Sequence, residues 1–391
     1  MDINITAEGS TDFTPDNFFV VTPDGWKNSI TKTANPGKEF TLNLTSPADK
    51  DSEGEVLVML DNKQGNTTIG RIKVDSKSTY LVIKDATAGK IAEAIREHDM
   101  EYIVASGSFN KTDWDAIAAN RNTLLYLDLE NCTYVEGDGE NLIYRNNGDS
   151  YPQSYPLKNL RLPQNITKIG DGAFNLCAYL TDVKLPDKIE SIGKYAFRHC
   201  SSLTEIKLPD GLKEIKTYLF YGCTSLTNII IPDGLESIGD DAFHECKNLT
   251  DIKLPNGLKN IGKAAFIYCS KLTSIKLPDG LKEIQASLFY ECTSLTNITI
   301  PDGLESIGQE AFYNCNIKNI TLPKSIKSIG DRSFECNSLT TVTCLAETPP
   351  SISSFTFPGN NINIYVPVGS VESYKKTPGW TFFADKITAI P

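Results

Sequence analysis

Residues 208–230 read LPDGLKEIKTYLFYGCTSLTNII, and almost every landmark in this stretch returns 23 residues later. A (Leu/Ile)-Pro pair opens each copy, and a phenylalanine follows at a constant distance. These phenylalanines are Phe174, Phe197, Phe220, Phe243, Phe266, Phe289, Phe312 and Phe334, and only the last step is 22 residues. A fixed period in the twenties indicates a solenoid, in which one supersecondary unit stacks on copies of itself.

Each copy predicts one flat, β-rich coil. The apolar residues of the strand 203–208 are expected to face inward, and Pro-Asp-Gly at 209–211 turns the chain. Leu212, Ile215 and Phe220 then return along the opposite side. Stacked copies align equivalent apolar residues and bury a continuous core that no single copy could make. The copies that start at Leu208 and Leu277 agree at 18 of 23 positions, which indicates a duplicated and lengthened surface.

Eight of the ten cysteines also follow the repeat. They form one column close behind the phenylalanines: Cys177, Cys200, Cys223, Cys246, Cys269, Cys292, Cys315 and Cys336. A disulfide between neighbouring coils is geometrically conceivable but would join segments that the ladder already holds. We therefore interpret the column as free thiols that fill a buried slot. Zinc is less favoured, because the sequence has no CxxC and its three histidines share no ligand spacing with the cysteines.

Outside the repeats the chain is predicted to contain three further parts. Residues 1–77 alternate short strands with turns and predict a small all-β sandwich. Residues 78–156 combine helices over 86–97 and 113–120 with strands over 102–105 and 124–129, then a long loop over 136–155. This region is expected to cap the array at 157–345 and to include a degenerate first repeat. Residues 346–391 are expected to form the C-terminal cap, with a strand at 362–366, a helix at 370–375 and a seal made by Trp380, Phe382 and Phe383.

Composition excludes several classes of function. A net charge of −11 argues against a nucleic-acid partner or an anionic membrane surface, because both require clustered positive charge. The sequence has no apolar run long enough to cross a bilayer, so no membrane insertion is expected. No signal peptide is visible, since residues 1–4 open on polar, strand-like sequence; one interpretation is that Met1 replaces a removed export signal.

The unit LPxGLxxIGxxAFxxC, together with the tail from Tyr365-Val366-Pro367 to Gly379-Trp380, resembles the BspA-type leucine-rich repeat proteins over about residues 80–391. These are surface or secreted proteins common in oral and gut Bacteroidetes. The resemblance implies an extracellular or cell-surface location and adhesion or ligand binding without enzymatic activity. In the general leucine-rich pattern Asn or Cys follows the strand, whereas here Gly211-Leu212 occupies that turn, so no buried asparagine ladder is expected. The N-terminal sandwich looks like the small Ig-like modules that often precede such arrays.

The outward-facing residues of the predicted strands form a first candidate binding surface. Threonines fill one column, and acids, amides and lysines fill the two beside it. Such a face is equally consistent with solvated strand residues that pair across neighbouring coils. The candidate ligand-binding residues on it are Lys184, Glu205, Lys207, Asn228, Asp251, Lys253 and Lys276.

A second candidate surface follows the phenylalanine column. The residue after each buried phenylalanine should lean out along one edge, and these positions hold Asn175, Arg198, Tyr221, His244, Ile267, Tyr290 and Tyr313, with Tyr268 beside them. Tyrosine gives a large, rigid, amphipathic contact area, which favours binding. The alternative is that these rings only pack against neighbouring coils. We take Tyr221, His244, Tyr268, Tyr290 and Tyr313 as the candidate residues.

Little in the sequence supports a metal site or catalysis. Aspartates of the Pro-Asp-Gly turns stack and could hold calcium, but Asn256 and Lys324 interrupt the column and aspartate has a sufficient role in the turn. No nucleophile elbow or phosphate loop is present, and His98, His199 and His244 fall in separate contexts. We therefore expect no metal, no cofactor and no enzyme.

The sequence favours an exported, surface-attached monomer whose array binds another protein, such as a host or matrix component. One alternative is glycan capture through the N-terminal sandwich or the tyrosine edge. Another is a rigid spacer with no ligand of its own. Exposed tyrosines along the array would favour a protein partner, whereas a flat aromatic cluster within residues 1–77 would favour a glycan.

Overall fold

The computed structural model divides the chain into two compact units, residues 1–80 and 81–391. It describes residues 2–6, 18–21, 27–32, 39–45, 54–61, 67–74, 80–95, 100–135, 154–359 and 362–391. The sequence predicts four parts, and that finer division of the chain remains a proposal.

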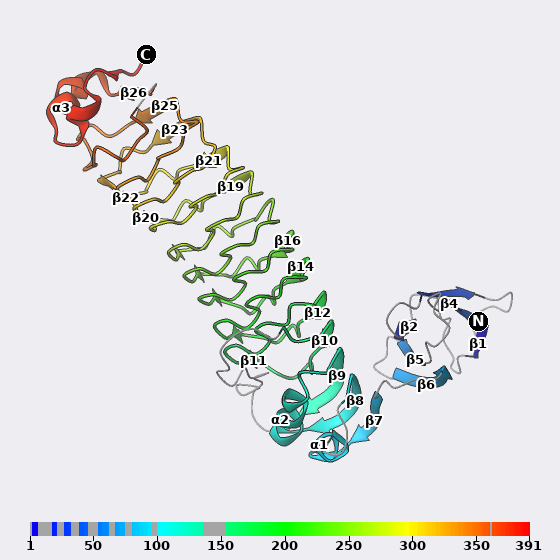
Figure 1. Cartoon of the computed structure of the whole chain (residues 1–391). Coiled ribbons are helices and arrows are strands. Elements are labelled where there is room, and N and C mark those ends of the chain that lie inside the picture. Colours follow the sequence, from blue (N-terminus) through cyan, green and yellow to red (C-terminus); the bar gives the residue numbers. More distant parts are fainter. Residues whose placement is uncertain are drawn as a thin grey trace. The chain divides into compact units, whose positions relative to one another are not determined.

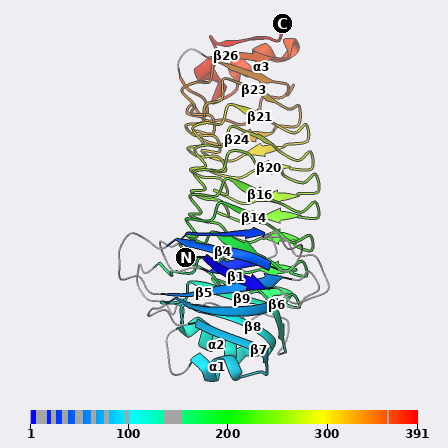
Figure 2. The same cartoon turned by 90° about the vertical axis from the view of Figure 1, so that its right-hand side faces the viewer.

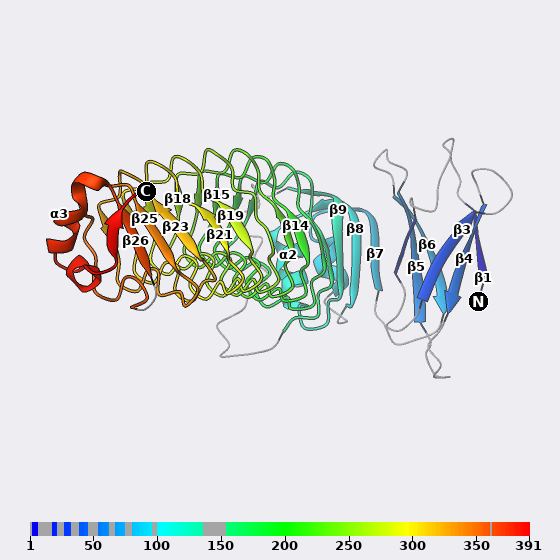
Figure 3. The same ribbon diagram turned by 90° about the horizontal axis from the view of Figure 1, so that it is seen from above.

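The first unit contains two three-stranded antiparallel sheets (Figure 3). One is ordered β1-β4-β3, from Asp2–Thr6, Glu39–Thr45 and Lys27–Lys32. The other is ordered β2-β5-β6, from Phe18–Val21, Gly54–Asp61 and Thr67–Val74. The polar strand β3 was not expected from its composition, and its pairing with β4 places it in the sheet. The Ig-like character of this unit remains a prediction.

The second unit begins with strands and helices that close one end of the solenoid (Figures 1 and 2). They are β7 (Tyr80–Ala86), α1 (Lys90–Ile95), β8 (Tyr102–Phe109), α2 (Lys111–Ala119) and β9 (Tyr126–Tyr134). The predicted helix over 86–97 is wrong at its start, because Ala86 still belongs to β7. Most of the predicted loop over 136–155 lies outside the described residues.

A single buried carboxylate organises the two helices. Asp113 accepts hydrogen bonds from the backbone N–H groups of Gly89 (2.7 Å), Ala92 (2.8 Å) and Asn110 (3.0 Å). The Asn110 side chain accepts from the Asp113 N–H in return, which completes a capping box at the start of α2. Asp113 therefore satisfies free N–H groups at the beginnings of both α1 and α2.

The repeat array is a β-solenoid whose coils stack in chain order (Figure 1). Each coil is named here by its phenylalanine. One row of short strands consists of β10 (Asn159–Arg161), β12 (Asp182–Lys184), β14 (Glu205–Lys207), β16 (Asn228–Ile230), β19 (Ser274–Lys276), β21 (Asn297–Thr299), β23 (Asn319–Leu322) and β25 (Thr341–Cys344). The opposite row consists of β11 (Lys168–Ile169), β13 (Ser191–Ile192), β15 (Glu214–Ile215), β17 (Ser237–Ile238), β18 (Asn260–Ile261), β20 (Glu283–Ile284), β22 (Ser306–Ile307) and β24 (Ser328–Ile329). Where neighbouring strands of a row pair, they are parallel and in register with the repeat, as Glu205 pairs with Asn228.

A column of stacked phenylalanine rings forms the centre of the core. Successive rings from Phe174 to Phe357 have centroids 5.0–5.9 Å apart and are nearly parallel. The column ends against Trp114, whose ring meets Phe174 edge-on at 6.5 Å, and against Trp380, 5.8 Å from Phe357. Both tryptophans are fully buried. The sequence indicated Trp380 as a seal but not Trp114 or Phe357.

The repeat cysteines are free and buried, as expected. The structure adds a role that the apolar interpretation missed. Each thiol from Cys200 to Cys336 donates to the backbone carbonyl of the phenylalanine in the preceding coil, with sulfur–oxygen distances of 2.9–3.4 Å. Cysteine therefore fills the slot and also ties each coil to the one before it.

Burial predicts how these thiols react. It raises the pKa of Cys223 to about 12, so the reactive thiolate is scarce in the folded protein. At pH 8 we expect an aromatic disulfide reagent to label almost none of the ten cysteines before unfolding, and all ten after it. The pKa of Cys223 is higher in the folded protein than in the unfolded chain. The stability that comes from burying this thiol in its protonated form is therefore fully present below pH 9 and is lost as the pH rises toward 12. Rapid labelling of the native protein, or fewer than ten thiols after unfolding without reductant, would contradict the free column.

The C-terminal cap contains β26 (Asn363–Val366), η2 (Val368–Ser370), α3 (Val371–Lys376), η3 (Trp380–Phe383) and β27 (Ile387–Ala389). Its strands continue the sheet in the order β23-β25-β26-β27. The predicted strand and helix are confirmed, whereas the predicted role of Phe382 is wrong: its side chain is 59% exposed. In the 3₁₀-helix η3, residues three apart share a face, so Trp380 and Phe383 turn inward and Phe382 turns outward.

Candidate functional site

The phenylalanine turn of each coil positions the side chains of one candidate surface. From the Phe174 coil to the Phe312 coil, the residues two before and two after the phenylalanine have left-handed backbone, as at Asp241 (φ 53°) and Glu245 (φ 59°). Positive φ is uncommon for residues with a side chain, and hydrogen bonds between coils hold it here. The backbone N–H groups of one turn donate to carbonyl oxygens of the next at 2.8–3.0 Å: Tyr218 to Asp240, Phe220 to Ala242 and Gly222 to His244.

This geometry sends the phenylalanine inward and its neighbours outward. The positions two before, one after and two after each phenylalanine are partly or fully exposed from Gly172 to Asn314, apart from Gly222. We call the surface made by these three positions the turn edge. It extends from the Phe174 coil to the Phe312 coil, because these coils repeat the same turn.

Aromatic rings on the turn edge touch in an unbroken series. Neighbouring centroids lie 4.5–5.9 Å apart across six consecutive coils. At about 4.8 Å for each step between coils, the series is roughly 24 Å long. We call it the aromatic ribbon, and it consists of Tyr195, His199, Tyr218, Tyr221, His244, Tyr268, Tyr290 and Tyr313.

All five turn-edge residues proposed from the sequence lie in the ribbon, and three of its members were missed. Tyr195 and Tyr218 stack at 5.0 Å and 9°. Both lie two residues before a phenylalanine, and this shared spacing was the available signal. His199 was not among the candidate residues either. The sequence pattern predicted separate contexts for His199 and His244, and this expectation is wrong. The rings of His199 and His244 both contact Tyr221, at 5.3 and 4.5 Å.

Neighbouring charged groups orient one ribbon ring and shift the pKa values of two others. His244 Nδ1 lies 2.7 Å from Asp241 Oδ1, which orients the imidazole against the neighbouring tyrosines. Asp241 also raises the pKa of the Tyr218 hydroxyl, and partial burial adds to that effect. Burial lowers the pKa of His199, and the adjacent Arg198 lowers it further, so His199 is neutral at pH 7.

The other seven candidate residues lie on the strand row, where their side chains align between coils. Lys184, Glu205, Lys207, Asn228, Asp251, Lys253 and Lys276 are all exposed. Lys184 reaches Glu130 at 2.5 Å. Several threonines beside them donate their hydroxyls to the preceding coil, as Thr227 does to the Thr204 carbonyl at 3.0 Å. This face is polar and is partly engaged in bonds between coils, and the ring contacts of the ribbon do not extend to it.

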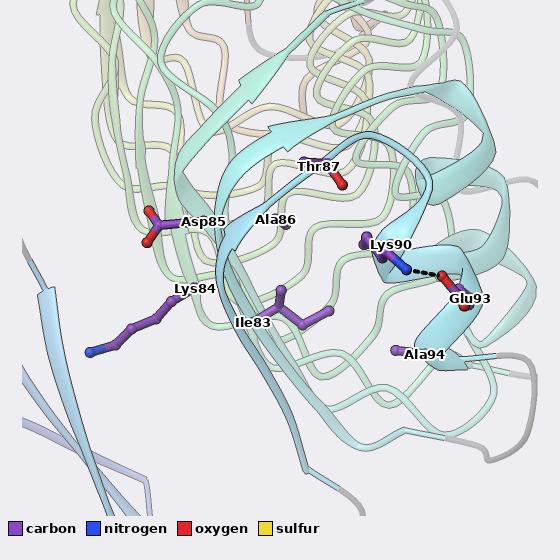
Figure 4. A pocket seen from close by; sticks show the side chains of 8 residues that line it. All are labelled: Ile83, Lys84, Asp85, Ala86, Thr87, Lys90, Glu93 and Ala94. Carbon is purple, nitrogen blue, oxygen red and sulfur yellow. Dashed lines mark hydrogen bonds and ion pairs between the residues drawn. The ribbon is translucent and has the colours of Figure 1, made fainter.

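A surface pocket of about 570 Å³ lies between β7 and α1 (Figure 4). Ile83 and Ala94 line it, and Lys90 and Glu93 pair at 2.6 Å across the first turn of α1. The N–H groups of Gly89 and Ala92 already donate to Asp113, so the start of α1 does not offer them to an anion. No sequence pattern predicted this pocket, and its paired charges make it a weaker candidate than the ribbon.

Two further findings concern only the part of the chain that the structure describes. No group of three or more His, Cys, Asp or Glu side chains there is placed to hold a metal ion. None of the helices described is long and apolar enough to cross a bilayer.

Stacked coils with leucine, isoleucine and phenylalanine inward define a leucine-rich-repeat solenoid. The chain belongs to the BspA-type leucine-rich repeat family, whose profile matches residues 148–273 and 259–377, more than half of the chain. No curated protein sequence matches this chain.

Solved structures with similarity to the chain are also leucine-rich repeat proteins. One from Bacteroides ovatus is 30% identical over 55% of this chain and 64% of its own, with a TM-score of 0.46. The match therefore spans less than two thirds of that relative. One from T. pallidum is 32% identical over 47% of this chain and 80% of its own, with a TM-score of 0.39. A leucine rich cell surface protein from Faecalibacterium prausnitzii is 19% identical over 89% and 96%, with a TM-score of 0.38.

Proposed function

We propose that this protein acts at the cell surface or outside the cell and binds a protein partner along the aromatic ribbon. The observation that carries the proposal is the continuity of the ribbon over six coils. Family membership supports repeat-based protein binding, and the surface location is part of the proposal.

The composition of the ribbon suits a protein interface. Tyrosine offers ring area and a hydroxyl at little conformational cost, and tyrosine and arginine are common among the residues that dominate binding energy. Tyr195 and Tyr268 are 39% and 40% exposed, so a partner could cover them further. Neighbouring rings hold one another in place, so binding would immobilise few new torsions.

Ring packing favours a protein over a glycan at this edge. A sugar stacks with its C–H face flat against an open aromatic face. Tyr290 and Tyr313 instead lie face to face at 4.8 Å and 8°, and Tyr195 and Tyr218 do the same at 5.0 Å and 9°. Each ring of these pairs has one face covered by the other ring, so a flat sugar cannot lie across both rings, whereas the outer faces, the ring edges and the hydroxyls remain for a ligand. The glycan alternative through the N-terminal unit concerns side chains outside the described residues.

The arrangement supports binding more than catalysis. Ribbon residues recur along an axis, whereas catalytic groups must converge on one reacting atom. Asp241 and His244 form a close pair, but His244 packs its ring between Tyr221 and Tyr268. We propose a non-enzymatic protein on this ground.

The test compares the full chain with two matched triple variants on an array of extracellular-matrix proteins and glycans. One variant is Tyr221→Ser with Tyr290→Ser and Tyr313→Ser. The control, on the strand row, is Lys207→Ser with Lys253→Ser and Lys276→Ser. We expect a matrix protein to bind the full chain, the tyrosine variant to lose at least about tenfold in affinity, and the lysine variant to change by less than about twofold.

Far-UV circular dichroism verifies that both variants keep the fold. A folded tyrosine variant with unchanged binding removes the ribbon as the site. Binding to glycans alone would favour the glycan alternative, and a chain that binds nothing on the array would favour a spacer.

A further inference from the structure

Charge is unevenly distributed along the turn edge: Arg198 is its one basic residue, and its acids lie closer to the C-terminus. In the Phe197 coil the three turn-edge positions hold Tyr195, Arg198 and His199. In the Phe243, Phe289 and Phe312 coils the same positions hold the acids Asp241, Glu245, Glu291 and Glu310, and no lysine or arginine. Each acid lies in the same turn as a ribbon ring. The C-terminal half of the ribbon is therefore both aromatic and anionic.

Contacts between coils hold one of these carboxylates beside a ring pair. Glu291 follows Tyr290, and its Oε2 accepts a hydrogen bond from Asn314 Nδ2 at 2.9 Å. Asn314 follows Tyr313, whose ring stacks on Tyr290 at 4.8 Å. This hydrogen bond fixes one carboxylate oxygen of Glu291 between the Phe289 and Phe312 coils. The Glu291 side chain is partly exposed.

Arg198 shows which group fits a ribbon ring. The Arg198 guanidinium lies over the Tyr221 ring, with its central carbon 5.2 Å from the centroid. A cation over an aromatic face is attracted by the negative charge of the ring's π-system. In the Phe266 coil the position of Arg198 is taken by Ile267, and acids accompany the rings beyond it. Glu245 already lies 3.4 Å from Lys247 Nζ, so the countercharge for a cation that another molecule would supply comes from Glu291 and Glu310, in the turns of Tyr290 and Tyr313.

We propose that Tyr268, Tyr290 and Tyr313, with Glu291 and Glu310, bind an arginine-rich segment of a protein partner. We call these residues the anionic ribbon. A guanidinium can stack on a tyrosine ring while its N–H groups donate to a nearby carboxylate, which an ammonium does less well. The inference rests on the proposed function and specifies the chemistry of its partner.

The test measures binding of fluorescent octa-arginine, octa-lysine and octa-glutamate peptides to the full chain by anisotropy. Any basic peptide is attracted by the net charge of −11, so variants with equal charge changes are compared. One is Glu291→Gln with Glu310→Gln; the control on the strand row is Glu205→Gln with Asp251→Asn. We expect octa-arginine to bind tighter than octa-lysine, and the first variant to weaken it by at least about fivefold against less than about twofold for the control.

A second variant, Tyr290→Ser with Tyr313→Ser, should also weaken octa-arginine and should remove its advantage over octa-lysine. Equal losses in the two acid variants would show a general field effect and overturn the inference, as would comparable binding of octa-glutamate. If the inference fails in this way while the tyrosine triple variant still loses its matrix protein, the proposed function stands without a cationic partner. If that triple variant keeps its matrix protein, the proposed function itself fails.

Discussion

Replacing Phe266 by alanine is expected to lower the free energy of unfolding by about 3–5 kcal/mol. The Phe266 side chain is fully buried. Its ring lies between those of Phe243, 5.3 Å away, and Phe289, 5.5 Å away. Truncation would open a cavity in the middle of the column, and the two neighbouring rings cannot close it because their own coils are held by hydrogen bonds on both sides. Both interfaces of one coil would weaken together, which matters in a fold whose stability comes from contacts between neighbours.

Urea unfolding followed by far-UV circular dichroism measures this loss, with Phe355→Ala as the control. The control removes the same atoms from a side chain that is 62% exposed, so it should change stability by less than about 0.5 kcal/mol. A Phe266 variant as stable as this control would show that the stacked column is not what stabilises the array.

Replacing Trp380 by alanine is expected to cost a similar amount, about 3–5 kcal/mol, and to loosen the C-terminal end of the array. Trp380 is fully buried and its indole N–H donates to the Pro350 carbonyl at 2.7 Å. Its ring meets Tyr374 edge-on at 4.8 Å and also contacts Phe357, the last ring of the column. The variant would lose this packing and leave a buried carbonyl without its donor.

Phe382→Ala is the matched control, because it changes an aromatic residue of the same 3₁₀-helix that faces outward. Hydrogen exchange in the last coils should accelerate in the Trp380 variant and remain close to wild type in the Phe382 variant. If both variants exchanged alike, the end of the solenoid would not depend on Trp380.

Much of the array could be predicted from its period alone. A repeat of constant length forces equivalent residues into columns, so the inward phenylalanines and the free, buried cysteines follow from one coil such as 208–230. The same argument indicated the outward position of Tyr221 and its equivalents. The hydrogen bond from each thiol to a phenylalanine carbonyl was beyond reach, because it depends on the distance between coils and not on spacing along the chain.

Non-repeating parts were harder to predict. Phe382 was misassigned because a 3₁₀-helix changes which apolar residues share a face. Helix α1 was predicted to begin too early because Ala86 favours a helix, whereas the sheet extends β7 to that residue. Trp114 was not recognised as the first seal of the core, because its contact with Phe174 joins segments that are sixty residues apart.

The candidate site could also be predicted only in part. Sequence spacing was enough to place Tyr221, Tyr290 and Tyr313 in one outward row, because every coil has the same length. Whether the rings of different columns touch is a tertiary property. The left-handed turns and the hydrogen bonds between coils bring Tyr218 and Tyr268 into contact with that row, and Tyr195 stacks on Tyr218. A period along the chain specifies columns, but only the packing of coils specifies how the columns meet to make the aromatic ribbon.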